Sequence, residues 1–193
     1  MKNAGTLTLT TPTGREIVMT RVFDAPRCLV FDAFTKPELL KRWFGPRGWS
    51  LVVCEVDLKV GGGFRFVLRD PDGKEMGMRG AYREIVPPER SVQMESFDDY
   101  PSESQVTAIF VEQGGKTTLT ATVLYPSAEV RDAVLRSGME RSATERLRQA
   151  CRASGIGRAS FDKKGSNGGI AKRLIRGAPP GRLSALLKQL FFR

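Results

Sequence analysis

Few residues of this chain are of the types that usually carry out chemistry. It contains no histidine, which excludes Ser-His-Asp, Cys-His and histidine-metal centres. Its three cysteines, Cys28, Cys54 and Cys151, form no CxxC pair, so we expect reduced thiols rather than a zinc site or a disulfide framework. Asp70 and Asp72 stand in a DPDG segment that lacks the rest of a calcium loop. We interpret this segment as a turn and predict no metal and no other cofactor.

The net charge is concentrated at the C-terminal end of the chain. Residues 1–150 contain 21 Lys and Arg against 20 Asp and Glu, a balance of +1. Residues 151–193 contain 10 against 1, a balance of +9, which completes the formal net charge of +10. Seven glycines also fall in this last part. We therefore predict one domain over residues 1–150 and a basic, glycine-rich tail over residues 151–193 that is disordered or non-native.

Periodicity and turn residues divide the domain into alternating groups of strands and helices. Asp24 before Pro26 favours a helix start in which the Asp24 carboxylate caps free amides. Val130, Val134 and Leu135 recur at helical spacing after Pro126. The expected elements are strands at 6–10 and 16–23, short helices from Pro26 and over 37–43, an antiparallel meander over 49–125, and a long helix over 127–149.

The strands of the meander have one apolar face and one charged face. Val52 and Cys54 alternate with Val53 and Glu55, and Phe64 and Phe66 alternate with arginines. The apolar face must be buried, and the long helix is the element available to cover it, which predicts an α+β fold. We interpret the other face as a solvated surface of ion pairs rather than an anion site. Its charged residues are Glu55, Asp57, Arg65, Arg69, Arg79 and Arg83.

Four segments in the right order give the chain a family resemblance. They are FDAPRCLVFDAFTKPELLKRWFGPRG at 23–48, VDLKVGGGFRFVLRDPDGKE at 56–75, REIVPPERSV at 83–92 and LYPSAEVRDAVLRSGME at 124–140. Residues 15–147 resemble homologues of the C-terminal domain of the heat-shock protein 90 ATPase activator, within the START-like helix-grip (SRPBCC) superfamily. The resemblance implies a curved antiparallel sheet with two short helices, wrapped around a long C-terminal helix.

The resemblance also implies a cavity between the sheet and the C-terminal helix. A small apolar or aromatic molecule would bind there, with the protein acting as a carrier or sensor; lipid binding and a stress-response role belong to the same expectation. Methionine and aromatic side chains suit such a wall, although each can equally fill the core. The candidate ligand-binding residues are Trp43, Phe44, Phe66, Met78, Tyr82, Met94, Leu135 and Met139.

Two other functions follow from the same superfamily. Its cyclases and hydratases use buried acids and tyrosines, and Tyr82 with Glu84 or Glu95 is the pair that this chain offers. We assign no catalytic residue and favour a protein that is not an enzyme. The eponymous protein is a co-chaperone, so the alternative is a protein-interaction module with a chaperone as partner. The oligomeric state is left open.

The family pattern is lost near residue 148. We interpret this loss as a reading-frame change or an unstructured extension, with a functional basic tail as the alternative. In that alternative, residues 170–176 and 183–192 would lie on acidic lipid or nucleic acid. The N-terminus lacks the apolar core of a signal peptide, and apolar runs such as 51–54 fall far short of the roughly 20 residues that span a bilayer. A cytoplasmic protein is therefore predicted.

Overall fold

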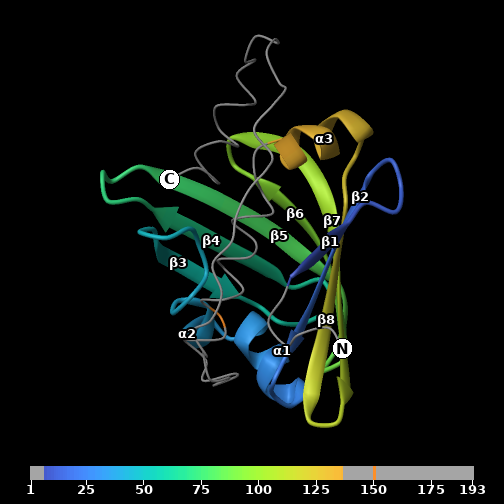
Figure 1. Ribbon diagram of the computed structural model, residues 1–193. Helices are drawn as coiled ribbons and strands as arrows, with labels where there is room; N and C mark the ends of the chain where they lie inside the picture. Colours follow the sequence, from blue (N-terminus) through green and yellow to red (C-terminus); the bar gives the residue numbers. More distant parts are fainter. Residues whose placement is uncertain (1–6, 137–149, 151–193) are drawn as a thin grey trace, which may run out of the picture.

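The computed structural model describes residues 7–136 and residue 150 of the chain. In this part a strand pair is followed by two helices, six strands and a third helix (Figure 1). The strands are β1 (Thr8–Thr10), β2 (Glu16–Phe23), β3 (Ser50–Val56), β4 (Gly63–Arg69), β5 (Glu75–Val86), β6 (Arg90–Phe97), β7 (Tyr100–Gln113) and β8 (Lys116–Leu124). The helices are α1 (Arg27–Thr35), α2 (Pro37–Leu40) and α3 (Ala128–Arg136).

The strands form one antiparallel sheet in the order β1-β2-β8-β7-β6-β5-β4-β3. The six strands that follow α2 are neighbours in chain order, which confirms the predicted meander. The N-terminal hairpin extends the meander beyond its last strand. Strand β2 pairs with β8 from Glu16 opposite Leu124 to Phe23 opposite Thr117 without a shift in register. Figure 1 shows this sheet curving around the helices. The fold is the predicted α+β helix-grip fold.

The helices lie on one face of the sheet, which we call the inner face; the opposite face is the outer face. Three buried clusters occupy the inner face, and we name each after its helix. The α1 cluster contains Phe23, Ala25, Val30, Phe31, Ala33, Phe110 and Leu119. The α2 cluster contains Leu40, Trp43, Leu51, Phe64, Phe66, Leu68, Met76, Met78, Tyr82 and Ala150. The α3 cluster contains Ile17, Val123, Tyr125 and Val134.

The tight turns of the sheet use the expected residues. Gly114 and Gly115 connect β7 to β8 with φ values of 59° and 72°, the left-handed conformation that a two-residue hairpin turn requires. The Asp70 carboxylate accepts hydrogen bonds from the amides of Asp72 and Lys74, at 3.0 and 2.8 Å. The DPDG segment is therefore a turn closed by its own aspartate, as predicted.

The start of α1 differs from the prediction. Asp24 does not cap the helix, because its carboxylate pairs with the Lys116 ammonium at 3.1 Å. Instead, Glu112 at the end of β7 accepts a hydrogen bond of 2.8 Å from the amide of Arg27. A carboxylate at a helix N-terminus satisfies a free amide and complements the helix dipole. The cap therefore comes from a strand 85 residues away in the sequence, which local patterns do not reveal.

The second helix and the first strand of the meander also depart from the expected pattern. The regular turn of α2 ends at Leu40 rather than at residue 43, and residues 41–43 form a turn. In β3 the register shifts between Leu51 and Val53. Because of this bulge Val52, expected on the apolar face, is 37% exposed, whereas Leu51 is buried.

Two predictions lie outside the described residues. Helix α3 accounts for residues 128–136 of the long helix expected over 127–149, and residues 137–149 are not described. The tail over 151–193, with its reading-frame and nucleic-acid or lipid alternatives, is not described either. Within the described ranges, no helix is long and apolar enough to cross a membrane.

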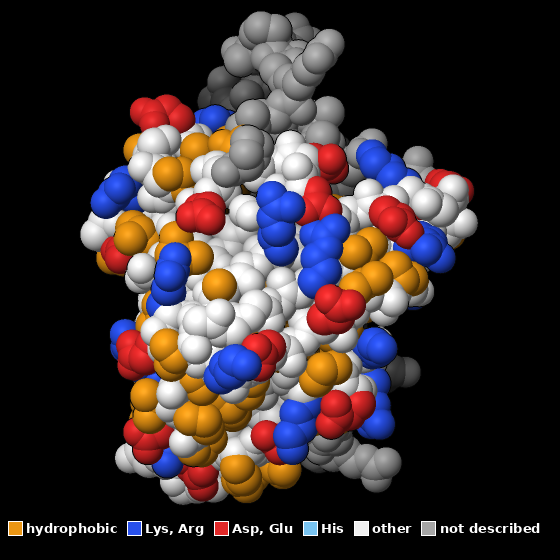
Figure 2. Space-filling view, turned by 180° about the vertical axis from the view of Figure 1, so that it is seen from behind, with side chains coloured by type: hydrophobic (Ala, Val, Ile, Leu, Met, Phe, Trp, Pro, Cys, Tyr) orange, Lys and Arg blue, Asp and Glu red, His pale blue; other side chains and the backbone are white. Residues whose placement is uncertain are grey.

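The outer face has the charged character that alternation predicts. Figure 2 shows Lys, Arg, Asp and Glu side chains intermixed there. Its central ion pair joins Arg65 on β4 to Asp98 after β6, with Nη1 and Oδ1 2.7 Å apart. This hydrogen bond holds the pKa of the Asp98 carboxyl below its usual range. Arg69 pairs with Glu75, with Nη2 and Oε1 2.6 Å apart.

Gly80 in β5 provides a test of how closely β5 packs against β4 and β6. A methyl group at this position would overlap the Met94 carbonyl oxygen and the Phe64 ring, and overpacking of this kind costs about 3 kcal/mol. We expect Gly80→Ala to lower the free energy of unfolding by that amount in urea denaturation. Gly14→Ala is the control, because nothing lies within 4 Å of the added carbon, and its effect should stay within about 0.5 kcal/mol. Equal effects of the two substitutions would contradict the packing described for β4, β5 and β6.

Candidate functional site

The centre of the inner face carries small side chains. Ala121 on β8 lies opposite Ala108 on β7, and Ala108 lies opposite Ser91 on β6. Residues paired across antiparallel strands share a face, so these three form one row between Met19 and Ile85, which stand at its two ends. The two alanines are half-buried, in contrast to the three buried clusters around them. We call Ala121, Ala108 and Ser91 the central row.

Polar side chains adjoin the central row on the same face. Gln93 lies between Tyr82 and Val106 in the register, and Glu95 lies between Gly80 and Ser104. The Gln93 amide donates a hydrogen bond of 3.1 Å to the Glu95 carboxylate. Both side chains are half-buried. The inner face therefore offers polar groups beside a row of small side chains, and sites for small molecules usually combine a few polar groups with apolar walls.

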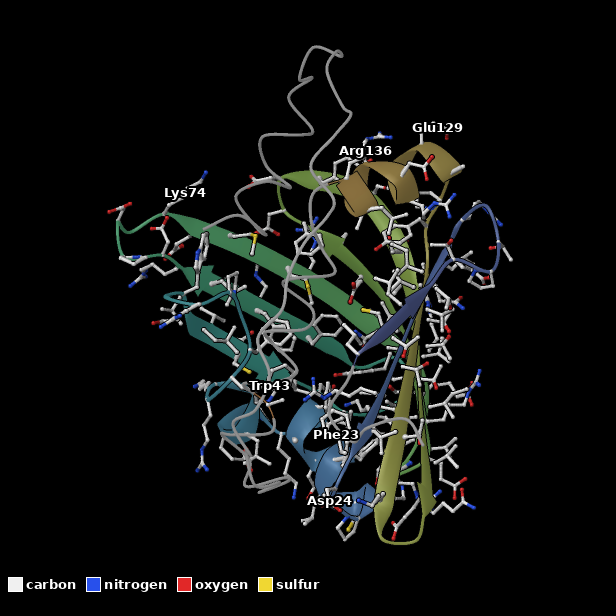
Figure 3. The ribbon with its side chains drawn as sticks, in the orientation of Figure 1. Phe23, Asp24, Trp43, Lys74, Glu129 and Arg136 are labelled. Atoms are coloured by element: carbon white, nitrogen blue, oxygen red, sulfur yellow. The ribbon has the colours of Figure 1, made fainter. Side chains whose placement is uncertain are left out.

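Aromatic rings from β4, β5 and the turn after α2 pack together beside α2; Figure 3 labels one of them, Trp43. The Phe44 ring lies 5.7 Å from that of Trp43 and 5.0 Å from that of Phe66, and the Phe64 ring lies 5.5 Å from that of Tyr82. The Trp43 indole donates a hydrogen bond of 3.0 Å to the carbonyl of Ala33, which holds it against α1. Such edge and tilted ring pairs are each worth about 0.5–1.5 kcal/mol beyond the burial of their area.

Most of the predicted ligand-binding residues do come together. Trp43, Phe66, Met78 and Tyr82 belong to the α2 cluster, and Phe44 packs against it. Leu135 packs separately against the α3 cluster. Met139 lies outside the described residues.

The structure does not bring Met94 to the site, contrary to the prediction from the sequence pattern. It lies opposite Ala81 and Gln105, on the face opposite Tyr82, and so it points away from the site. The alternation of Val92 and Met94 looks like a buried apolar stripe, but in β6 the inward positions are Ser91, Gln93 and Glu95. The polar alternation of these three residues was the signal that could have identified the inner face here.

The tyrosine and acid pairing considered from the sequence is not assembled as expected. The register of β5 shifts between Tyr82 and Glu84, and this bulge turns Glu84 to the outer face. There its carboxylate pairs with Arg90, with Oε1 and Nε 3.0 Å apart. Glu95 remains on the face of Tyr82. Burial, reinforced by the nearby Cys54 thiol, raises the pKa of Tyr82 to about 12, so this phenol stays protonated at neutral pH.

Arg21 is the inner-face residue that sequence reasoning missed. It lies opposite Leu119 in the β2–β8 pairing, and the residue is only 4% exposed. Its guanidinium carbon lies 5.5 Å from the centre of the Phe23 ring, a cation–π distance. Arg21 belongs to the series of inward-facing residues of β2, which are Ile17, Met19, Arg21 and Phe23. A single arginine in an otherwise apolar period-2 series is the signal that marks it.

Neither thiol described by the structure is paired. Cys28 is exposed and Cys54 is half-buried, and both are free. Burial raises the pKa of the Cys54 thiol, which keeps it protonated and unreactive at neutral pH. In the described part of the chain, no three cysteine, aspartate or glutamate side chains are grouped so that they could hold a metal ion.

Comparison with known proteins gives a consistent result. Residues 24–151 match the family model described as activator of Hsp90 ATPase homolog 1-like protein. A crystal structure from Rhodobacter sphaeroides is 30% identical over 74% of this chain and 94% of that chain, with a TM-score of 0.72. A crystal structure from Nitrosomonas europaea is 25% identical over 75% and 98%, with a TM-score of 0.67. A solution structure from Staphylococcus epidermidis is 26% identical over 77% and 93%, with a TM-score of 0.69. No curated protein matches the chain.

The raised pKa of Tyr82 makes a testable contribution to the pH dependence of stability. An unfolded tyrosine ionises near pH 10 and the folded one near 12, so the stabilisation is complete below pH 10 and is lost as the pH rises towards 12. Between pH 8 and 11 the wild type should therefore lose about 1.4 kcal/mol more unfolding free energy than Tyr82→Phe does. Urea denaturation at both pH values measures this difference. Identical losses would show that the phenol is not buried as described.

Proposed function

From the premise that this chain belongs to the activator of Hsp90 ATPase homolog 1-like family, we propose that its inner face binds a small apolar or aromatic molecule. The protein would act as a carrier or sensor of that molecule. Membership of the family supports a ligand-binding or protein-interaction module in general terms. Binding of a small molecule is a narrower function than this, and its support comes from the side chains on the inner face.

The composition of the inner face is the observation that carries the proposal. Three buried clusters surround a centre of small or polar side chains, of which Ala108, Ala121, Gln93 and Glu95 are half-buried and Ser91 is buried. A core without a ligand function is filled with large apolar side chains at its centre. Here Ala108 and Ala121 stand at that centre instead, so a bound molecule would contact the sheet directly and the aromatic rings of the α2 cluster from the side.

The affinity that such a contact supplies is moderate. Removing about 300 Å² of apolar ligand surface from water contributes about 7 kcal/mol. The loss of translational and rotational freedom opposes binding, so dissociation constants of roughly micromolar order are expected. Binding of this strength needs no catalytic group, which agrees with the protonated state of Tyr82 and with the outward position of Glu84.

A matched pair of alanine substitutions tests the proposal on the full chain. Ala108→Leu fills the central row, whereas Ala81→Leu adds the same three carbons to the outer face, where Ala81 lies opposite Met94. The probe is 1-aminoanthracene, a neutral aromatic molecule, followed by its own fluorescence and by quenching of Trp43 and Trp49. We expect saturable one-to-one binding to the wild type, at least tenfold weaker binding to Ala108→Leu, and a change of less than twofold in Ala81→Leu.

The outcomes separate the functions considered. Equal weakening in both variants, with thermal unfolding unchanged, would place the probe elsewhere than on the inner face and contradict the proposal. Absence of binding to the wild type, by this probe and by a panel of fatty acids and polyketide-like aromatics, would favour the protein-interaction module. A chaperone is the partner that would then be tested by pull-down.

A further inference from the structure

We infer that the ligand of the inner face is an apolar molecule with a carbonyl or a similar oxygen acceptor, and that the Tyr82 hydroxyl donates a hydrogen bond to this group. The inference rests on the proposed function, because it concerns the chemical class of the molecule that binds over the central row. It assigns Tyr82 a polar contact in addition to the apolar contact of its ring.

The buried hydroxyl of Tyr82 is the first step. The residue is only 4% exposed, yet among the described residues its hydroxyl has no hydrogen-bond partner. Other buried donors of the inner face do have one. The Trp43 indole donates to the Ala33 carbonyl at 3.0 Å, and the Thr117 hydroxyl donates to the Ala25 carbonyl at 2.7 Å. A buried hydroxyl without a partner costs free energy that a phenylalanine at the same position would avoid.

The surroundings of Tyr82 are the second step. Its ring lies 5.5 Å from the Phe64 ring, within the apolar α2 cluster. Gln93 lies opposite Tyr82 on β6, but its amide donates a hydrogen bond of 3.1 Å to the Glu95 carboxylate. The Glu95 side chain also takes part in a further interaction within the chain. Gln93 and Glu95 are therefore bonded to each other rather than to the phenol.

The protonation of the phenol is the third step. Burial and the Cys54 thiol raise the pKa of Tyr82 to about 12, so the hydroxyl keeps its proton at neutral pH. A phenol donates a hydrogen bond more readily than it accepts one, because its ring withdraws electron density from the oxygen. A carbonyl oxygen accepts hydrogen bonds and has no proton to donate. It is therefore the group that complements this hydroxyl.

The position of Tyr82 relative to the central row completes the argument. Tyr82 lies opposite Gln93, which is two residues from Ser91 of the central row on the same face. Neighbouring strands are about 5 Å apart and successive inward residues about 7 Å apart, so a body of two fused rings reaches from the central row to the phenol. The Tyr82 oxygen is not one of the fully enclosed unpaired atoms of the described residues, so a ligand group can touch it.

Ser91 is a second buried hydroxyl of the inner face, and among the described residues it has no hydrogen-bond partner either. A serine hydroxyl can turn towards the backbone beside it, whereas the rigid ring of Tyr82 holds its hydroxyl away from its own backbone. The inference therefore rests on Tyr82, and the test below removes the Tyr82 hydroxyl.

Two planar probes of the same shape test the inference on the full chain. The first is the ketone 2-acetylnaphthalene, and the second is 2-isopropenylnaphthalene, in which a methylene group replaces the carbonyl oxygen. Equilibrium dialysis at neutral pH measures both dissociation constants. We expect Tyr82→Phe to lower the affinity for the ketone, relative to that for the hydrocarbon, about fivefold, and to change the affinity for the hydrocarbon less than twofold. Tyr125→Phe is the control, because it removes a hydroxyl from a tyrosine buried in the α3 cluster, and it should leave the ratio unchanged.

Two further measurements separate a ligand contact from a structural role of the hydroxyl. Without ligand, Tyr82→Phe should unfold at the same urea concentration as the wild type or at a higher one, because an unpaired hydroxyl stabilises nothing. In infrared spectra, the carbonyl stretch of the bound ketone should lie at lower frequency in the wild type than in Tyr82→Phe. Should Tyr82→Phe fail to fold, the stretch in the wild type compared with that of the ketone in hexane decides the question.

Each outcome decides something different. An unchanged ratio in Tyr82→Phe, with the same carbonyl frequency in both proteins, overturns the inference and leaves the proposed function intact. Equal losses of ketone affinity in Tyr82→Phe and Tyr125→Phe would show a general effect of removing a tyrosine hydroxyl and would also overturn the inference. Binding of neither probe by the wild type contradicts the proposed function itself, and the inference with it.

Discussion

The pairing of β2 with β8 is the interaction on which the rest of the structure depends. It joins the N-terminal hairpin to the last strand of the meander over eight consecutive residue pairs. The Thr117 hydroxyl, fully buried, donates a hydrogen bond of 2.7 Å to the carbonyl of Ala25 and fixes where the chain leaves β2. Lys116 and Glu112 then hold Asp24 and the amide of Arg27. The hairpin between β7 and β8 thereby sets the position of α1 on the inner face.

The inner face carries three buried clusters with the central row between them. Aromatic pairs such as Phe31 with Phe110, whose ring centres are 5.4 Å apart, tie α1 to the sheet. Leu40 and Trp43 do the same for α2, and Val134 for α3. These clusters carry the burial that stabilises the fold, whereas the two alanines of the central row contribute little to it.

Bulges in β5 and β3 change which face of the sheet some side chains take. A bulge reverses the parity of a strand, so every residue beyond it changes face. The shift between Tyr82 and Glu84 keeps Tyr82 inside and sends Glu84 to Arg90 on the outer face, so Glu84 does not share a face with the phenol. The shift between Leu51 and Val53 buries Leu51 and exposes Val52 on the edge strand. Both changes follow from backbone pairing rather than from the side-chain pattern.

The sequence by itself determined the fold class, the meander and the turn at Asp70, and it identified aromatic residues after α2 and on β4 and β5 that pack together, because these features depend on local periodicity and on turn chemistry. Only the tertiary structure decided that Glu112 caps α1, that Met94 and Glu84 face outward, and that Arg21 is buried beside the central row. The reason is physical. Strand register and bulges arise from pairing between segments far apart in the sequence, and a shift of one residue exchanges the inner and outer faces.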